Sequence, residues 1–161
     1  MKKGLVSVLS MATGIVLGAI AIDKVKEKTL EHKQSGQDRY KAYYNMLNQW
    51  IELKQKGIPL ERYFNEYGYQ SIAIYGMGEM GNRLYEELKD TNIEVKYAVD
   101  QNTDCTDLEL KVVDKDSISE KADVMVVTAV YAYQEIEEEL QSKVTFPIVA
   151  LDDIIYELNL E

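Results

Sequence analysis

The sequence predicts an α/β fold, in which a small parallel sheet flanked by helices is preceded by an N-terminal transmembrane helix and an amphipathic helical collar. Three observations lead to this fold class. A charge-free apolar run lies near the N-terminus, aromatic side chains recur at helical spacing after it, and short β-branched strands alternate with helices from residue 71 onward. We therefore divide the chain into residues 1–22 (membrane anchor), 23–37 (charged linker), 38–69 (helical collar) and 70–161 (α/β domain).

The composition narrows the classes of function. The 18 basic and 28 acidic residues give a net charge of −10. This charge argues against nucleic acid as a partner, because duplex binding requires basic side chains that neutralise phosphates. A bound phosphate must therefore be held by local backbone donors. Cys105 is the only cysteine and His32 the only histidine, so we expect no disulfide within the chain, no metal site and no Ser-His-Asp triad.

The run from Gly4 to Ile22 contains 19 residues without a charge. As a helix it would be roughly 28 Å long, close to the ~30 Å hydrocarbon thickness of a bilayer. Gly14 and Gly18 form a GxxxG pair, a spacing that lets two membrane helices approach, so the sequence allows a homodimer. We predict a single-pass membrane anchor with the C-terminal domain in the cytoplasm, because basic residues follow the run and nucleotide ligands are cytoplasmic.

Two other interpretations of this run stay open. Ala19-Ile20-Ala21 resembles the cleavage site of a secretory signal peptide, although the run is longer than the usual apolar region of such a signal. A buried helix of a soluble protein is the other alternative. Positive charge lies on both sides of the run, so the asymmetry that sets membrane orientation is small.

Residues 23–37 alternate charges and are expected to form an exposed helix. In the collar that follows, the spacing predicts one apolar stripe of an amphipathic helix, with Gly57 after its end and Pro59 beyond it. A short second helix over residues 59–67 stops at Gly68. Given the acidic charge, we interpret the aromatic residues as core packing and not as a base-stacking surface. The stripe consists of Tyr40, Tyr43, Tyr44, Leu47, Trp50, Ile51 and Lys54, and the second helix presents Leu60, Tyr63 and Phe64.

A glycine motif follows the first predicted strand, residues 71–75, and opens a helix over residues 82–90. This order of strand, glycine turn and helix is typical of a Rossmann-like nucleotide-binding unit. In such a unit Gly76 makes the tight turn, Gly78 lets the backbone approach a pyrophosphate, and Gly81 lets the helix pack on the sheet. The amides and dipole at the helix start then attract the phosphate of a small ligand.

The remaining segments continue the alternation. A second strand over residues 93–99 ends at Asp100, where an acidic side chain can accept ribose hydroxyls. Thr128 follows a buried strand, on the edge where parallel sheets bind ligands. We predict further strands over residues 110–113, 123–130 and 146–151, and helical segments over residues 116–121, 131–143 and 152–158. The predicted ligand-binding residues are Gly76, Met77, Gly78, Glu79, Met80, Gly81, Asp100 and Thr128.

Two observations leave an empty site as an alternative. Glu79 lies inside the glycine motif, where its carboxylate can repel a phosphate. Asp100 can equally serve as a turn residue that ends its strand. The glycine turn would then be retained for its shape, with no ligand bound.

Three segments resemble the Rossmann-like nucleotide-binding domain of bacterial surface-polysaccharide proteins: residues 72–81 (IAIYGMGEMG), 84–88 (LYEEL) and 95–100 (VKYAVD). There the domain accompanies membrane-bound nucleotide-sugar dehydratases, sugar-phosphate transferases and glycosyltransferases. The resemblance covers about residues 70–158, and it includes an acidic residue in the loop. It implies that Gly76, Gly78, Gly81 and Asp100 contact a nucleotide, and that the partner is an enzyme of cell-envelope glycan metabolism. The catalytic domains of those proteins have no counterpart in this sequence.

No catalytic constellation is evident. Tyr85 and Lys89 match the Tyr-x-x-x-Lys spacing of short-chain dehydrogenases, but they lie on the helix directly after the glycine motif, where catalytic use is not expected. Asp152-Asp153 and residues 137–139 are interpreted as a helix start and a solvated face. The leading hypothesis is a membrane-anchored module, not an enzyme, that binds a nucleotide, a nucleotide-sugar or NAD(P). The alternatives are a structural adaptor with an empty fold and a small NAD(P)-dependent oxidoreductase.

Overall fold

The computed structural model describes residues 36–102 and 110–160. The chain divides into two compact units, Met1–Lys41 and Ala42–Glu161, and the sheet belongs to the second unit. The predicted membrane segment, residues 4–22, and the linker up to residue 35 lie outside the described residues. Among the helices within the described ranges, none combines the length and the apolar character needed to cross a bilayer.

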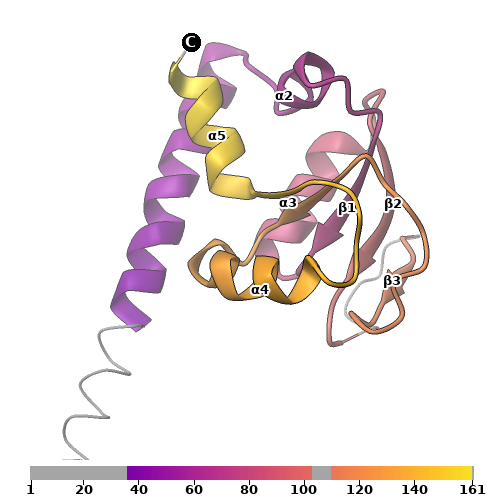
Figure 1. Cartoon of the computed structure of the whole chain (residues 1–161). Helices are drawn as coiled ribbons and strands as arrows, with labels where there is room; N and C mark the ends of the chain where they lie inside the picture. The colour runs from indigo at the N-terminus through magenta and orange to yellow at the C-terminus, as the bar shows by residue number, and fades with distance from the viewer. Residues whose placement is uncertain (1–35, 103–109, 161) are drawn as a thin grey trace, which may run out of the picture. The chain divides into compact units, whose positions relative to one another are not determined.

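Five parallel strands form one sheet in the described part of the chain, as the alternation of strands and helices predicted (Figure 1). The strand order is β3-β2-β1-β4-β5, so the chain builds outward from β1 on one side and then crosses to β4 on the other side. At the end of β1, Tyr75 is aligned with Val99 of β2 and with Val127 of β4. The strands are β1 (Ser71–Tyr75), β2 (Glu94–Val99), β3 (Val112–Val113), β4 (Val124–Val127) and β5 (Ile148–Ala150).

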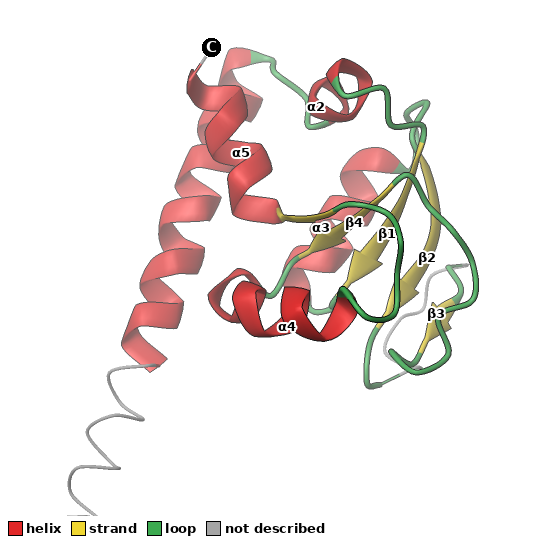
Figure 2. Ribbon diagram, in the orientation of Figure 1, coloured by secondary structure: helices red, strands yellow, loops and turns green. Residues whose placement is uncertain are grey.

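Helices cover both faces of this sheet (Figure 2). Successive strand residues point to opposite faces, so each strand contributes to two cores. Ile72 and Ile74 of β1 pack with residues of α2, α3 and α5, whereas Ala73 packs in the second core with Leu140 of α4. The helices are α2 (Glu61–Glu66), α3 (Glu79–Leu88), α4 (Tyr133–Leu140) and α5 (Leu151–Leu160), with a 3₁₀ turn η1 (Val130–Ala132) before α4 and a helix over residues 36–56 at the start.

The buried face of the helix over residues 42–56 differs from the predicted stripe. Trp50 is buried as expected, but it packs beside Met46 and Leu53, and not beside Tyr44 and Ile51. Tyr44 is 66% exposed and Ile51 is 53% exposed. Met46, Trp50 and Leu53 recur at intervals of four and three, and Tyr44, Leu47 and Ile51 recur at intervals of three and four. Helical spacing therefore cannot choose between adjacent stripes, and packing against the shared core decides which of them is buried.

The predicted helical segment over residues 116–121 is wrong, because the chain passes from β3 to β4 as a loop. The Asp114 side chain accepts a hydrogen bond from the Asp116 amide at 2.9 Å, and its carbonyl accepts one from the Ser117 amide at 2.8 Å. Such local bonds from an aspartate compete with helix formation. Farther along, the Tyr97 hydroxyl donates to the Glu120 carbonyl, which holds the loop against the sheet.

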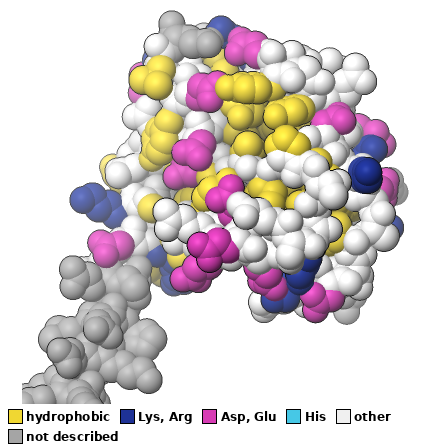
Figure 3. Space-filling model, in the orientation of Figure 1, with side chains coloured by type: hydrophobic (Ala, Val, Ile, Leu, Met, Phe, Trp, Pro, Cys, Tyr) yellow, Lys and Arg dark blue, Asp and Glu magenta, His cyan; other side chains and the backbone are white. Residues whose placement is uncertain are grey.

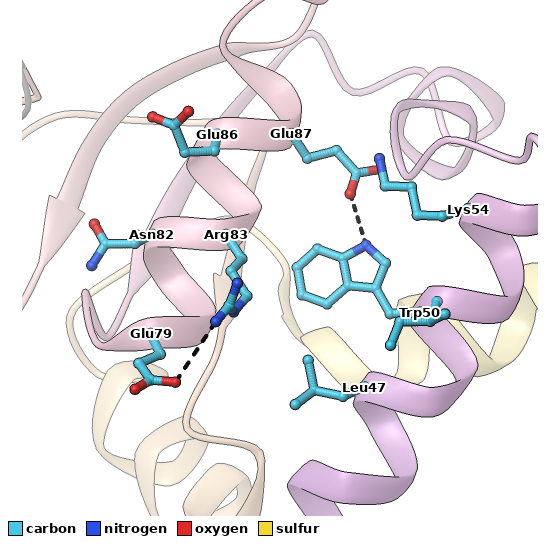
Figure 4. A pocket seen from close by; sticks show the side chains of 9 residues that line it. Leu47, Trp50, Lys54, Glu79, Asn82, Arg83, Glu86 and Glu87 are labelled. Atoms are coloured by element: carbon cyan, nitrogen blue, oxygen red, sulfur yellow. Dashed lines mark hydrogen bonds and ion pairs between the residues drawn. The ribbon is translucent and has the colours of Figure 1, made fainter.

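Glu87 connects α3 to the collar (Figure 4). Its carboxylate accepts a hydrogen bond from the Trp50 indole at 2.7 Å and one from the Leu60 amide at 3.0 Å. The Lys54 ammonium lies 2.8 Å from the same carboxylate, whose side chain is only 7% exposed. A carboxylate removed from water needs such partners. The collar therefore holds α3, and with it the glycine turn that precedes α3.

Candidate glycine-turn site

The turn between β1 and α3 requires a glycine at position 76. The backbone of Gly76 has φ +94°, a conformation that residues with a side chain rarely adopt. A Cβ atom here would lie 2.9 Å from the Thr128 hydroxyl oxygen. The Gly76 amide donates a hydrogen bond of 2.8 Å to the Val99 carbonyl, so the turn begins while the chain is still bonded to β2.

Gly81 allows the first turn of α3 to lie against the glycine turn. A Cβ atom at this position would be 2.1 Å from the Gly76 carbonyl oxygen and 3.3 Å from the Met77 sulfur. No side chain fits at the first of these distances. The close packing of helix and turn that we expected of the third glycine is therefore present.

Gly78 is the exposed glycine of the motif and the N-cap residue of α3. Its φ is −71°, and no atom lies within 4 Å of the position that a Cβ would take. Because Gly78 is a glycine, the start of α3 has no side-chain cap at this residue. Since the first amides of a helix lack partners within the helix, the space beside Gly78 adjoins backbone donors.

The other three residues of the motif differ in exposure. The side chains of Met77 and Met80 are buried in the core, so only their backbone can face a ligand. Glu79 is exposed, with its side chain 84% accessible and 3.9 Å from the Arg83 guanidinium. An exposed and loosely paired carboxylate can turn away from the helix start, so Glu79 does not block the space beside Gly78.

Asp100 follows β2 and ties the end of that strand to the glycine turn. Its carboxylate accepts a hydrogen bond from the Met77 amide at 2.7 Å and another from the Asn102 amide at 2.9 Å. Thr128 follows β4 and is only 4% exposed. Its hydroxyl lies 2.7 Å from the Gly76 carbonyl, to which it donates. Both predicted ligand-binding side chains therefore bond to the turn itself.

Asn82 is a further residue of this site that the sequence analysis did not identify. Its side-chain amide donates to the Met77 carbonyl and to the Gly78 carbonyl, both at 3.1 Å. These two bonds hold the glycine turn from the helix side. An amide side chain directly after the third glycine is the sequence signal that points to this role.

A cavity of about 410 Å³ opens beside the glycine turn. It lies at the carboxyl ends of β1, β2 and β4, where the strand order reverses. Parallel sheets bind ligands at this place. The residues that line the cavity are Tyr75, Gly76, Val99, Asp100, Gln101, Lys115, Ala129, Tyr131, Glu135, Ile136 and Glu139.

Lys115 is the one basic residue among the described residues that line this cavity, and no sequence motif predicted it. Its ammonium lies 2.6 Å from the Glu139 carboxylate. The hydrogen bond between them raises the pKa of Lys115 and lowers the pKa of Glu139, so both groups stay charged at neutral pH. Burial raises the pKa of the Tyr75 hydroxyl, which is therefore neutral in the same range.

The residues that were considered for catalysis and set aside, Tyr85, Lys89, Asp152 and Asp153, have the following surroundings. Tyr85 packs against the core, and Lys89 forms an ion pair of 2.6 Å with Glu86. Asp152 and Asp153 lie in the first turn of α5. Over residues 36–102 and 110–160, no cluster of three or more acidic, histidine or cysteine side chains is placed to hold a metal ion.

Comparison with known proteins gives a match to a protein family. Among curated proteins and among solved structures, no match to the chain was found. Residues 68–146 match the family described as C2185-like, N-terminal. This segment runs from before β1 to the connection between α4 and β5, and it contains the glycine turn, Asp100 and Thr128.

Proposed function

We propose that this protein is a membrane-anchored, non-catalytic module that binds a nucleotide, a nucleotide-sugar or NAD(P) for an enzyme of cell-envelope polysaccharide biosynthesis. The glycine turn carries this proposal. Gly76 and Gly81 adopt positions that exclude side chains, while Gly78 leaves open space at the start of α3. A turn of this shape, at the point where the order of a parallel sheet reverses, is the arrangement that dinucleotide-binding proteins use.

The diphosphate would lie beside Gly78. There the first amides of α3 supply donors and the positive end of the helix dipole. This source of attraction is needed because the chain carries a net charge of −10 and acidic side chains are spread over the surface seen in Figure 3. Backbone donors act locally and do not depend on a basic surface.

The ribose and the group attached to it would occupy the cavity. Each carboxylate oxygen has two lone pairs, so Asp100 can hold the Met77 amide and still accept a ribose hydroxyl. The lining contains three carboxylates, Asp100, Glu135 and Glu139, against one cation, Lys115. Repulsion from these carboxylates favours an uncharged part of the ligand in the cavity. Between the two nicotinamide dinucleotides we therefore propose NAD, which lacks the 2′-phosphate.

The membrane part of the proposal rests on the 19-residue apolar run, and the polysaccharide part on the resemblance of residues 70–158 to domains of surface-polysaccharide proteins. Fractionation of cells tests the anchor. Full-length protein should sediment with membranes and resist carbonate extraction. Recovery of the uncleaved full-length chain in the soluble fraction would remove the anchor from the proposal.

A structural adaptor is the second candidate, and one observation favours it. The Asp100 carboxylate and the Thr128 hydroxyl are both bonded to the chain's own backbone, so the turn is complete without a ligand. In this case the fold would present a surface to a partner protein, and the cavity would have no occupant.

Native mass spectrometry of the full-length protein, purified in a mild detergent, distinguishes the two candidates. A nucleotide that co-purifies should appear as an added mass that is released on denaturation. Thermal-shift measurements with NAD, NADP, UDP and UDP-glucose then compare ligand classes. If no added mass is found and none of the four compounds raises the melting temperature at millimolar concentration, the adaptor takes first place.

A further inference from the structure

A groove of about 940 Å³ lies between the helix over residues 42–56 and α3 (Figure 4). Leu47, Trp50 and Ile51 form one wall. Arg83 and Glu86 belong to the other wall, on α3. The groove shares no lining residue with the cavity at the glycine turn, although it ends at Glu79 and Asn82, close to Gly78. An amphipathic helix can lay its apolar side chains against such an apolar wall.

A ridge of apolar side chains runs along the same helix as the groove wall. Tyr44, Leu47 and Ile51 follow one another at intervals of three and four residues. This is the spacing with which paired helices present their contact residues. Tyr44 and Ile51 are both more than half exposed, so no described segment of the chain covers these two side chains. Leu47 is partly buried against the core, so the exposed part of the ridge is formed mainly by Tyr44 and Ile51.

The charges of the groove indicate which kind of partner fits. Arg83 and Lys54 bring two cations to a lining that also contains Glu79 and Glu86. The fifth charged residue, Glu87, is already paired with Lys54 and Trp50. This region is nearly balanced in charge, on a protein whose net charge is −10. Two copies would repel each other over most of their acidic surface, but much less at this groove.

We infer that the groove and the ridge form the contact between two copies of this chain. About a two-fold axis, the ridge of each copy would lie in the groove of the other, since a two-fold contact uses the same patch on both partners. Arg83 of each copy would then approach carboxylates of the second copy. A strongly basic partner helix fits less well, because the groove already contains two cations.

The anchor under "Proposed function" would favour this pairing. It would hold two copies in one membrane and so raise their effective concentration. Gly14 and Gly18, at the spacing of paired membrane helices, lie within the same apolar run. The contact itself depends on the ridge and the groove, so it can be tested without knowledge of the ligand.

Disulfide cross-linking of the full-length protein, in the cells that express it, provides the test. Cys105 is replaced by serine, and single cysteines are introduced by Tyr44→Cys, Leu47→Cys or Ile51→Cys. Two cysteines form a disulfide only when their Cα atoms lie within about 7 Å. Identical positions approach each other only near a two-fold axis, so mild oxidation should yield a dimer at twice the chain's mass for at least one of these three variants. Asn45→Cys and Glu52→Cys, exposed on another side of the same helix, are matched controls that should stay monomeric.

A second variant pair tests the contact by charge. Ile51→Glu should abolish the cross-link formed by Tyr44→Cys or Leu47→Cys, because it places two like charges in the contact. Asn45→Glu, the matched control, should leave the cross-link intact. Both positions are exposed, so circular dichroism should remain unchanged. The proposal is overturned by the absence of a dimer for all three ridge variants, or by equal cross-linking of the ridge and control positions. Neither outcome decides whether the protein binds a nucleotide, because nucleotide binding is measured in a separate experiment.

Discussion

The Trp50 indole nitrogen donates a hydrogen bond of 2.7 Å to Glu87, which lies 37 residues later in the sequence. The bond joins the collar to α3, and α3 begins at the glycine turn. Lys54 and the Leu60 amide bind the same carboxylate, so three groups of the collar hold one side chain of the α/β domain. Because the Glu87 carboxylate is almost fully buried, the loss of one of these partners should destabilise both the collar and the α/β domain.

Trp50→Ala should lower the free energy of unfolding by about 3–5 kcal/mol, because it removes a large buried side chain and leaves a cavity. Trp50→Phe keeps most of the volume but removes the hydrogen bond to Glu87, and should cost about 1–3 kcal/mol. Chemical denaturation measures both values, with exposed Asn48→Ala as the control. Wild-type stability of Trp50→Ala would mean that the collar does not support the α/β domain.

Two glycines of the same turn should respond differently to alanine. Gly81→Ala places a methyl group 2.1 Å from the Gly76 carbonyl oxygen, so α3 must move and stability should fall by at least about 1–3 kcal/mol. Gly78→Ala meets no atom within 4 Å and should cost less than about 1 kcal/mol, since alanine is only a poorer N-cap. Melting temperatures of the two variants compare them directly. Equal losses would contradict the turn geometry.

Gly78→Ala also separates ligand binding from folding. If the diphosphate lies beside Gly78, a methyl group there should weaken a nucleotide ligand at least tenfold, or about 1.4 kcal/mol. Asp100→Asn should weaken ribose-containing ligands less, because it preserves the shape and removes only the charge. Isothermal titration with the nucleotide identified by mass spectrometry measures both effects. Asp90→Ala, at an exposed position just after α3, is the control that should bind as the wild type does.

Asp123 should make stability depend on pH. Its carboxylate accepts hydrogen bonds from the Gln70 and Ser71 amides and from the Ser71 hydroxyl, and these lower its pKa. A group with a lowered pKa in the folded state contributes stability at neutral pH and loses it as the pH falls below about 4. Asp123→Asn should therefore be less stable than the wild type at pH 7, and the difference should shrink toward pH 3.

Unfolding measured by urea at several pH values tests this, with exposed Asp90→Asn as the control. A difference between Asp123→Asn and the wild type that stays constant from pH 7 to pH 3 would rule out the carboxylate charge as its cause.

Much of the α/β fold was predictable from local patterns. The β-branched residues 71–75, the glycines that follow and the apolar spacing of α3 each act over a few residues, and all three elements were placed within a few residues of their bounds. The parallel sheet followed from the alternation of such strands with helices. The predicted segment over residues 116–121 failed because the hydrogen bonds of Asp114 favour a turn over a helix at its start.

The sequence by itself determined that a tight turn begins at Gly76 and passes directly into α3, because only glycines fit the φ of Gly76 and the close approach at Gly81. The tertiary structure alone decided the direction of Asp100 and Thr128, which bond to the turn because β2 and β4 both lie beside β1. It also decided which face of the collar helix is buried. Met46, Trp50 and Leu53 share one helical stripe and Tyr44, Leu47 and Ile51 share another, and only packing with α3 and α5 distinguishes the two stripes. The spacing of residues in the sequence defines which of them share a helix face, but contact between distant segments of the chain determines which face is buried.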